Sequence, residues 1–427
     1  KENNGATYGR RSDWQNLYTI AKKYYEALLA DPGNAQFHLT DPRGASDKSG
    51  RTFNNPYQYF FEQMHMDDAI YADESIYEYP MQQGGGNDGR PYSFGRPSSG
   101  GSKAAYPCKS YGQGRINPAY FYGIFDPNDM RRDVSITMTG SNGKGVEKLI
   151  PFVPNSKAEG GGLTLNKWDE NRQANPWVAA QRKSGINGPY MRMSEVYLGY
   201  AEVCAALGDV VTGKQYLKTV RERSFPQGLA DTDGFIASFG NDLVRAIIEE
   251  RGFEYAGEGD RRWTLIRSGY LPEDIKRIKD MTKAMMDGLA TKGYYEFENG
   301  NIISAYIWTK LVDAKTIYGH RLTAQCPMDK VNDPVLYPGW RGQKDNWEEM
   351  GLNYGNSAPA TNLAIKGLFE IVSEEEAASL ESQGYAKVNW GIDLVDYRDE
   401  YDKYLFWDYD YVSAPIYLWP FTPNVMA

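Results

Sequence analysis

The sequence predicts a mainly α-helical fold in which paired helices support a loop-rich face. The first observation is a set of apolar residues over 190–207 that recur at the spacing of one helical face. The second is a further helical segment, KQYLKTVRERSF, which follows after a short break, so the two form a pair of the kind that stacks in tetratricopeptide-like repeats. The third is the stretch 40–189, where Gly, Ser, Asn and Pro recur and favour turns.

The first predicted element is an amphipathic helix over residues 11–30, which Asp31-Pro32-Gly33 brings to an end. Its apolar residues fall at helical spacing. They are Trp14, Leu17, Tyr18, Ala21, Tyr25, Leu28 and Leu29. In the turn-rich stretch that follows, the pattern predicts only two short strands, at 75–79 and 133–138.

A second helical block is predicted to begin at Tyr190. Its first helix includes Cys204, which we interpret as a small core residue, and Gly208 is well placed to end it. The segment DVVTG forms the break before the second helix of the pair. A third helix is predicted to follow Asn241 as its N-cap and to run through DLVRAIIEERGFEYA.

The stretch EERGFEYAGEGDRRWTLIRSG, residues 249–269, combines five carboxylates with four arginines. Gly257 and Gly259 should end the third helix, and Asp260 should cap a short helix that closes at Ser268-Gly269. By spacing, Arg251 would pair with Glu254, and Arg261 and Arg262 with Glu258, which would lock the corner between the two helices. A glycosidase-like pair of carboxylates is the alternative, but the adjacent arginines would keep these acids ionised. The pattern therefore favours a structural clamp over an active site.

The charged stretch and the preceding helix pair resemble the SusD/RagB family of outer-membrane nutrient-binding lipoproteins of Bacteroidetes. That family carries an Arg-x-x-Glu-Val helix containing Tyr-Ala-Glu, a following Arg-x-Arg, and a long Glu-Arg signature. DESIYEYP, FDPNDMRRD and APIYLWPFTP extend the resemblance over most of the chain. The matching residues are Arg192, Glu195, Tyr200, Ala201, Glu202, Arg221, Arg223, Glu250, Arg251, Glu254, Glu258, Gly259, Arg261, Leu265 and Arg267.

The resemblance implies one SusD-like domain over residues 1–427, with tetratricopeptide-like helical pairs supporting a loop-rich ligand-binding face. Residues 40–189 would form the variable ligand-face segment, 190–270 the signature helical scaffold, and 271–427 a mixed C-terminal segment. Family members begin with a signal peptide, a lipid-bearing cysteine and a long helical region. We therefore expect an N-terminal part of the fold, including the lipid attachment, to lie outside this chain.

The resemblance also implies a function without catalysis. Such proteins are cell-surface lipoproteins of the outer membrane that bind oligosaccharides and deliver them to a SusC-like TonB-dependent transporter. Some members bind peptides instead, which stays an alternative. A glycoside hydrolase using two carboxylates and a purely structural helical adaptor are the remaining alternatives.

The aromatic residues supply the candidate ligand-binding positions. Aromatics form 14% of the chain, with 33 Tyr against 16 Phe and 10 Trp, and Tyr and Trp offer a flat apolar face with a hydrogen-bonding edge. Packing beneath a loop is the alternative role for each candidate. The expected burial of Trp263 and of the aromatics in YLFWDYDY keeps them off the candidate set. The candidates are Tyr92, Tyr106, Tyr111, Trp168 and Trp177 and, in second rank, Trp340 and Trp347.

Other partners and cofactors find little support in the sequence. The net charge of −9 and the lack of a Lys/Arg run disfavour nucleic acid. No stretch approaches the roughly 20 apolar residues of a membrane-spanning helix. Three scattered cysteines and three isolated histidines predict neither a disulfide framework nor a metal site. No cofactor is expected; a structural calcium at DTDG, residues 231–234, stays open beside the simpler reading as a turn.

Overall fold

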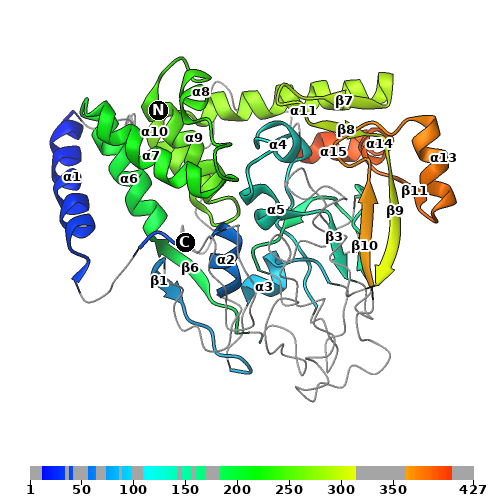
Figure 1. The fold of residues 1–427 in the computed structure, drawn as a ribbon, viewed down its shortest axis with the longest axis horizontal. Coiled ribbons are helices and arrows are strands. Elements are labelled where there is room, and N and C mark those ends of the chain that lie inside the picture. The colour runs from blue at the N-terminus through cyan, green and yellow to red at the C-terminus, as the bar shows by residue number, and fades with distance from the viewer. Residues whose placement is uncertain are drawn as a thin grey trace, which may run out of the picture.

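The structure is a computed structural model in which helices predominate. It describes residues 12–33, 38–41, 56–63, 74–85, 89–98, 109–141, 147–154, 160–168, 183, 185–313 and 361–405. Figure 1 shows the main helical block at one end and a small sheet with short helices at the other.

The helical block contains the predicted helix pair. Helix α6 packs against α7, α1 and α9, and α7 also packs against α9. The side chains of Tyr18, Ala21, Tyr25 and Leu29 on α1 pack against buried Cys204 and its neighbours on α6, as the apolar pattern predicted. The helices of this block are α1 (Trp14–Ala30), α6 (Met193–Ala206), α7 (Val210–Arg223), α8 (Thr232–Ala237), α9 (Leu243–Glu254), α10 (Asp260–Ser268) and α11 (Leu271–Lys292).

Several helix starts differ from the prediction. Asp242, rather than Asn241, is the N-cap of α9, and its side chain accepts a 3.0 Å hydrogen bond from the backbone N–H of Arg245. Asn241 instead adopts a left-handed backbone with φ of 66°. Gly259 occupies the cap position of α10, so Asp260 is the first helical residue and not the cap. The break before α7 is also shorter than expected, since Asp209 caps a helix that already begins at Val210.

The block is entered through a two-stranded antiparallel sheet, not directly by a helix. Strand β6 (Gly188–Arg192) pairs with β1 (Ser75–Tyr79), so Tyr190 lies in a strand, and the prediction that it starts a helix is wrong. The short strand expected at 133–138 is only partly correct, because α5 (Arg131–Ser135) precedes the two-residue strand β2 (Ile136–Thr137). The strand at 75–79 is confirmed.

The remaining strands form small antiparallel sheets. Strand β9 (Tyr306–Asp313) lies between β10 (Thr361–Lys366) and β11 (Ala386–Asn389). Strand β2 pairs with β5 (Thr164–Leu165). Two further pairs join β3 (Thr139–Ser141) with β4 (Glu147–Leu149), and β7 (Tyr294–Glu296) with β8 (Ile302–Ser304). The other helices are α2 (Pro56–Gln63), α3 (Gly89–Phe94), α4 (Pro118–Gly123), α13 (Glu374–Ser382), α14 (Gly391–Asp396) and α15 (Arg398–Leu405).

The largest hydrophobic core joins the two ends of the molecule. It contains Phe121 from α4, Phe253 from α9, Met285 from α11 and Trp390 just before α14. A second core, with Leu217 and Ile247, lies inside the helical block. The prediction that Trp263 is buried is wrong, because this residue on α10 is 52% exposed. Among the described residues, no helix has the length and apolar character needed to cross a membrane.

Replacing the observed cap of α9 should destabilise the protein. Asp242→Ala removes the acceptor of the Arg245 N–H, so the free energy of unfolding should fall by about 1 kcal/mol. Asn241→Gly should leave it unchanged or raise it, because glycine adopts a positive φ without steric cost. Urea denaturation of both variants tests the assignment, and a loss seen only for Asn241→Gly would contradict it.

Candidate functional site

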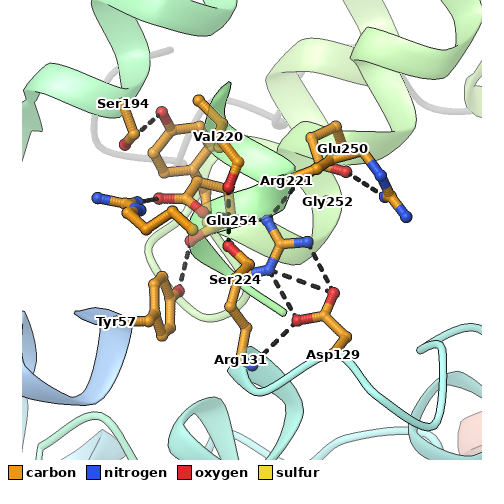
Figure 2. A network of polar contacts seen from close by, with 12 residues as sticks. Tyr57, Asp129, Arg131, Ser194, Val220, Arg221, Ser224, Glu250, Gly252 and Glu254 are labelled. Atoms are coloured by element: carbon orange, nitrogen blue, oxygen red, sulfur yellow. Dashed lines mark hydrogen bonds and ion pairs between the residues drawn. The ribbon is translucent and has the colours of Figure 1, made fainter. Parts of the chain in front are cut away.

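All five carboxylates of the charged stretch that stands out in the sequence form ion pairs, and three of them, Glu249, Glu250 and Glu254, are buried. Glu254 is the centre of this network (Figure 2). Its carboxylate accepts hydrogen bonds from Arg131 at 3.1 Å, Arg192 at 2.5 Å and Arg223 at 2.5 Å, and all four side chains are almost completely buried. One turn earlier on α9, Glu250 accepts from Arg131 and Arg221 at 2.7 and 2.6 Å.

The arginines of the stretch also join α9 to α10, but not through the partners that local spacing predicted. Arg251 pairs with Asp260 at 2.5 Å, and Arg261 pairs with Glu249 at 2.8 Å. Glu258 turns away from Arg261 and accepts from Lys167 at 2.6 Å and from Arg192 at 3.0 Å. The clamp is therefore present, whereas the predicted pairs with Glu254 and Glu258 are wrong.

The electrostatics of these acids oppose a role in acid catalysis. Burial raises the pKa of Glu254, but the charges of Arg223, Arg192 and Arg131 outweigh it and hold that pKa well below its usual range. Burial likewise opposes ionisation of Glu249, yet Arg261 and Arg277 lower its pKa to about 2. A general acid needs a raised pKa. These carboxylates are ionised instead, and their role is to form structural ion pairs with the arginines.

The same network holds both strands of the β1–β6 pair at their base. Glu74 immediately precedes β1, and Arg192 is the last residue of β6. The Arg192 guanidinium donates to Glu74 at 2.9 Å, and Arg223 on α7 pairs with the other oxygen of Glu74. These buried ion pairs fix the end of the sheet at Glu74 and Arg192, and they therefore hold its outer face in one orientation.

Three tyrosines gather on that outer face, which we call the tyrosine platform. Tyr77, Tyr79 and Tyr190 are 53%, 47% and 64% exposed. The Tyr190 ring lies 5.6 Å from each of the other two ring centroids, in edge-to-face geometry, and Tyr77 and Tyr79 are 6.2 Å apart. The strand register shifts at Tyr77, so the successive residues Tyr190 and Met191 are both exposed.

Trp168 is linked to the tyrosine platform through the side chain of Arg90, which contacts both. The Arg90 guanidinium lies 5.4 Å from the Tyr79 ring and 5.4 Å from the Trp168 ring. Its carbon and nitrogen atoms also pack against Gly188 in β6, where a Cβ would collide with them. This stack fixes the Tyr79 ring against the loop segment that carries Trp168.

Three of the seven candidate residues from the sequence lie in the described part of the chain. Tyr92 and Trp168 are buried, and Tyr111 is half-buried with its ring 5.0 Å from that of Tyr92. This placement agrees with the packing role that was left open for each, and their ligand contact stays a prediction. The other four lie outside the described residues: Tyr106, Trp177, Trp340 and Trp347.

Sequence reasoning missed the tyrosine platform. The strand SIYEY places Tyr77 and Tyr79 on one face, with Glu78 buried between them, and this alternation was a usable signal. Tyr190 was assigned to a helix because YMRMSEVY continues a helical pattern. Only the pairing with β1, more than one hundred residues away in the sequence, places its ring beside the other two.

The acidic turn at residues 231–234 has a local structural role. The Asp231 side chain caps α8 by accepting a 2.8 Å hydrogen bond from the Gly234 N–H, as a plain turn would require. Among the described residues, no group of three or more His, Cys, Asp or Glu side chains is arranged to hold a metal ion.

Comparisons with known proteins agree on one family. The model of the SusD family matches residues 36–420. A SusD-like protein of Formosa agariphila is 28% identical over 160 residues, which cover 37% of this chain and 26% of that protein. A SusD homologue of Bacteroides thetaiotaomicron has a TM-score of 0.42 at 17% identity, covering 64% of this chain and 53% of its own.

A third relative is a surface glycan-binding protein A of Bacteroides thetaiotaomicron, whose structure was solved in complex with laminarihexaose. It has a TM-score of 0.42 at 20% identity, covering 61% of this chain and 52% of its own. The chain therefore spans about a quarter of the length of the Formosa relative and about half of the two solved structures.

Removing the central carboxylate charge of the network should be severely destabilising. Glu254→Gln keeps the size of the side chain but leaves three buried arginines without their shared counter-charge, so unfolding should become easier by about 3–5 kcal/mol. Asp280→Asn, which breaks an exposed pair with Lys276, should change stability by less than about 0.5 kcal/mol. Chemical denaturation of both variants compares the two, and equal stabilities would show that the network contributes no net stabilisation.

Acid should weaken the fold through Glu249. Its pKa is about 2 in the folded protein against an ordinary 4.5, so the unfolded chain binds the proton first as the pH falls. The stabilisation is complete above the unfolded pKa and is lost as the pH falls from about 4.5 towards 2. Denaturation curves across this window should decline less steeply for Glu249→Gln than for the parent, and parallel declines would refute the assignment.

Proposed function

The chain belongs to the SusD family, and from this premise we propose that it binds oligosaccharides at the cell surface without catalysing their breakdown. It would then deliver them to a TonB-dependent transporter of the outer membrane. The observation that carries the proposal is the tyrosine platform, whose three exposed rings stand beside one another on a firmly anchored sheet.

The chemistry of the tyrosine platform suits a sugar chain. A pyranose ring presents an apolar C–H face, which packs on a flat aromatic ring, and hydroxyls at its edge, which hydrogen-bond to phenol groups. The edge-to-face arrangement leaves rings at steep angles to one another, between 61° and 88°, so a curved or folded chain meets more than one ring face. Rings that are already fixed by their neighbours also lose little conformational entropy when a ligand binds, and this favours affinity.

Burial and pairing of the acids support binding over hydrolysis. A retaining or inverting glycosidase needs two carboxyl groups facing one substrate bond across an open cleft. Glu250 and Glu254 are fully buried and are paired with arginines. The acids of the charged stretch therefore serve the scaffold, and ligand recognition falls to the exposed rings.

The transporter, the lipid attachment and the outer-membrane location are parts of the same proposal. They follow from what membership of this family implies about the whole protein. A transporter that receives the ligand needs a binding partner that releases it unchanged, which agrees with recognition by stacked rings rather than by a reacting group. The natural partner in this proposal is a SusC-like barrel encoded with this protein.

Truncating the tyrosine platform should weaken ligand binding. Tyr79→Ala and Tyr190→Ala each remove a stacking surface, so the Kd for a bound oligosaccharide should rise about tenfold, equivalent to ~1.4 kcal/mol. Tyr24→Ala is the matched control, because Tyr24 is 71% exposed on α1 and belongs to no part of the platform. Isothermal titration against a panel of oligosaccharides and peptides measures the effect.

Each outcome of that titration decides between functions. Binding of glycans that the two platform variants lose and Tyr24→Ala keeps supports the proposal. Binding of peptides alone would replace it with the peptide-binding alternative. Product release during prolonged incubation, abolished by Glu258→Gln, would make the protein a hydrolase.

A further inference from the structure

A recess of about 710 Å³ lies between α8, α9, α11 and the turn after β7, and it shares no residue with the tyrosine platform. We propose that this recess is a second saccharide site, which takes a single neutral pyranose unit. The inference rests on the proposed role in glycan binding, but it concerns separate residues and can fail on its own. The volume is within the range of about 300–1,000 Å³ that small-molecule sites occupy.

Aromatic rings form much of the wall of this recess. Phe235 on α8 and Phe239 in the turn that follows it are half-buried and lie 5.2 Å apart in edge-to-face contact. Buried Phe225 and Phe297 add further apolar surface to the lining. A ligand with an apolar face gains burial here, as the C–H face of a pyranose does.

A buried arginine in the lining has donor capacity to spare. Arg221 is only 3% exposed, donates one N–H to Glu250 at 2.6 Å, and lies 3.7 Å over the Phe235 ring. Its Nε is buried and has no acceptor among the described residues. Because Glu250 balances the charge, what Arg221 offers is an unused hydrogen-bond donor rather than a net positive charge.

Three carboxylates in the lining have acceptor capacity to spare. Asp126, Asp231 and Glu298 are exposed, and none of them pairs with a cation in the described part of the chain. Asp126 and Asp231 each use one oxygen in a local 2.8 Å hydrogen bond, to the N–H groups of Asn128 and Gly234. The second oxygen of each remains for a ligand hydroxyl.

One ligand class satisfies all three features together. A sugar hydroxyl both accepts from an N–H and donates to a carboxylate, and the ring it belongs to packs on phenyl groups. An anionic ligand would meet repulsion from the three carboxylates, and a cation that carries no acceptor group would leave the Arg221 Nε without a partner. The occupant is therefore expected to be neutral and rich in hydroxyls.

Methionine methyl groups allow the two sites to be observed in one experiment. Met281 lines the recess, whereas Met191 is exposed beside Tyr190 on the platform. With methyl-¹³C methionine, titration of the whole chain with glucose, galactose, mannose or xylose should shift the Met281 resonance in a saturable way for at least one sugar. Met281→Leu and Met191→Leu assign the two signals.

A blocking substitution and its matched control test the location. Ser238→Trp places an indole at an exposed position of the lining, and it should raise the apparent Kd read at Met281 by about tenfold or more. Ser382→Trp is the control, because both serines are exposed at helix ends and each donates a 2.7 Å hydrogen bond to the carbonyl three residues earlier. The double variant Tyr79→Ala, Tyr190→Ala should keep the Met281 response.

Three results would overturn the inference. A Met281 response that Ser238→Trp leaves intact would place the sugar elsewhere, and a Met281 signal silent to every neutral sugar would remove the site. A response to lysine methyl ester or glucuronate but not to neutral sugars would reject the ligand class. In all three cases the Met191 signal, read with an oligosaccharide, still decides the proposed function independently.

Discussion

The fold depends on the burial of charged side chains that have no water to solvate them. Each ion placed in the interior costs several kcal/mol unless its counter-ion arrives in good geometry. Glu254 receives hydrogen bonds from arginines on three separate segments, α5, β6 and α7. A partial network would leave an uncompensated charge in the interior, so each segment in place favours the docking of the others.

This constraint separates the buried charges that support the sheet from the aromatic rings exposed on its outer face. The arginine at the end of β6 and the glutamate before β1 fix the sheet from below, while its rings point outward and take no part in the charge pairing. Among the described residues, Arg90 is the one cation that contacts both the platform and the loop segment carrying Trp168. The buried ion pairs therefore hold the scaffold in place, and the aromatic rings on the outer face of the sheet remain exposed to a ligand.

Much of the helical architecture was predictable, because helical periodicity is a local property. The apolar spacing that identified α1 and α6 depends on neighbours within two turns, and both helices are present. The charge pairing was not predictable from local spacing. Glu258 is three and four residues from Arg261 and Arg262, yet its partners Lys167 and Arg192 come from distant segments. Trp263 was misjudged because the next residues, Thr264 and Leu265, form the buried face of α10 instead.

The register shift that exposes Tyr190 and Met191 side by side has a practical consequence for engineering. Four neighbouring outward positions, 77, 79, 190 and 191, can be randomised without touching a single buried charge. A library at these positions would vary the exposed side chains while the supporting sheet and its ion pairs stay the same, much as loops are diversified in antibody display. Under the proposed function, such a library is a starting point for reagents that distinguish closely related polysaccharides.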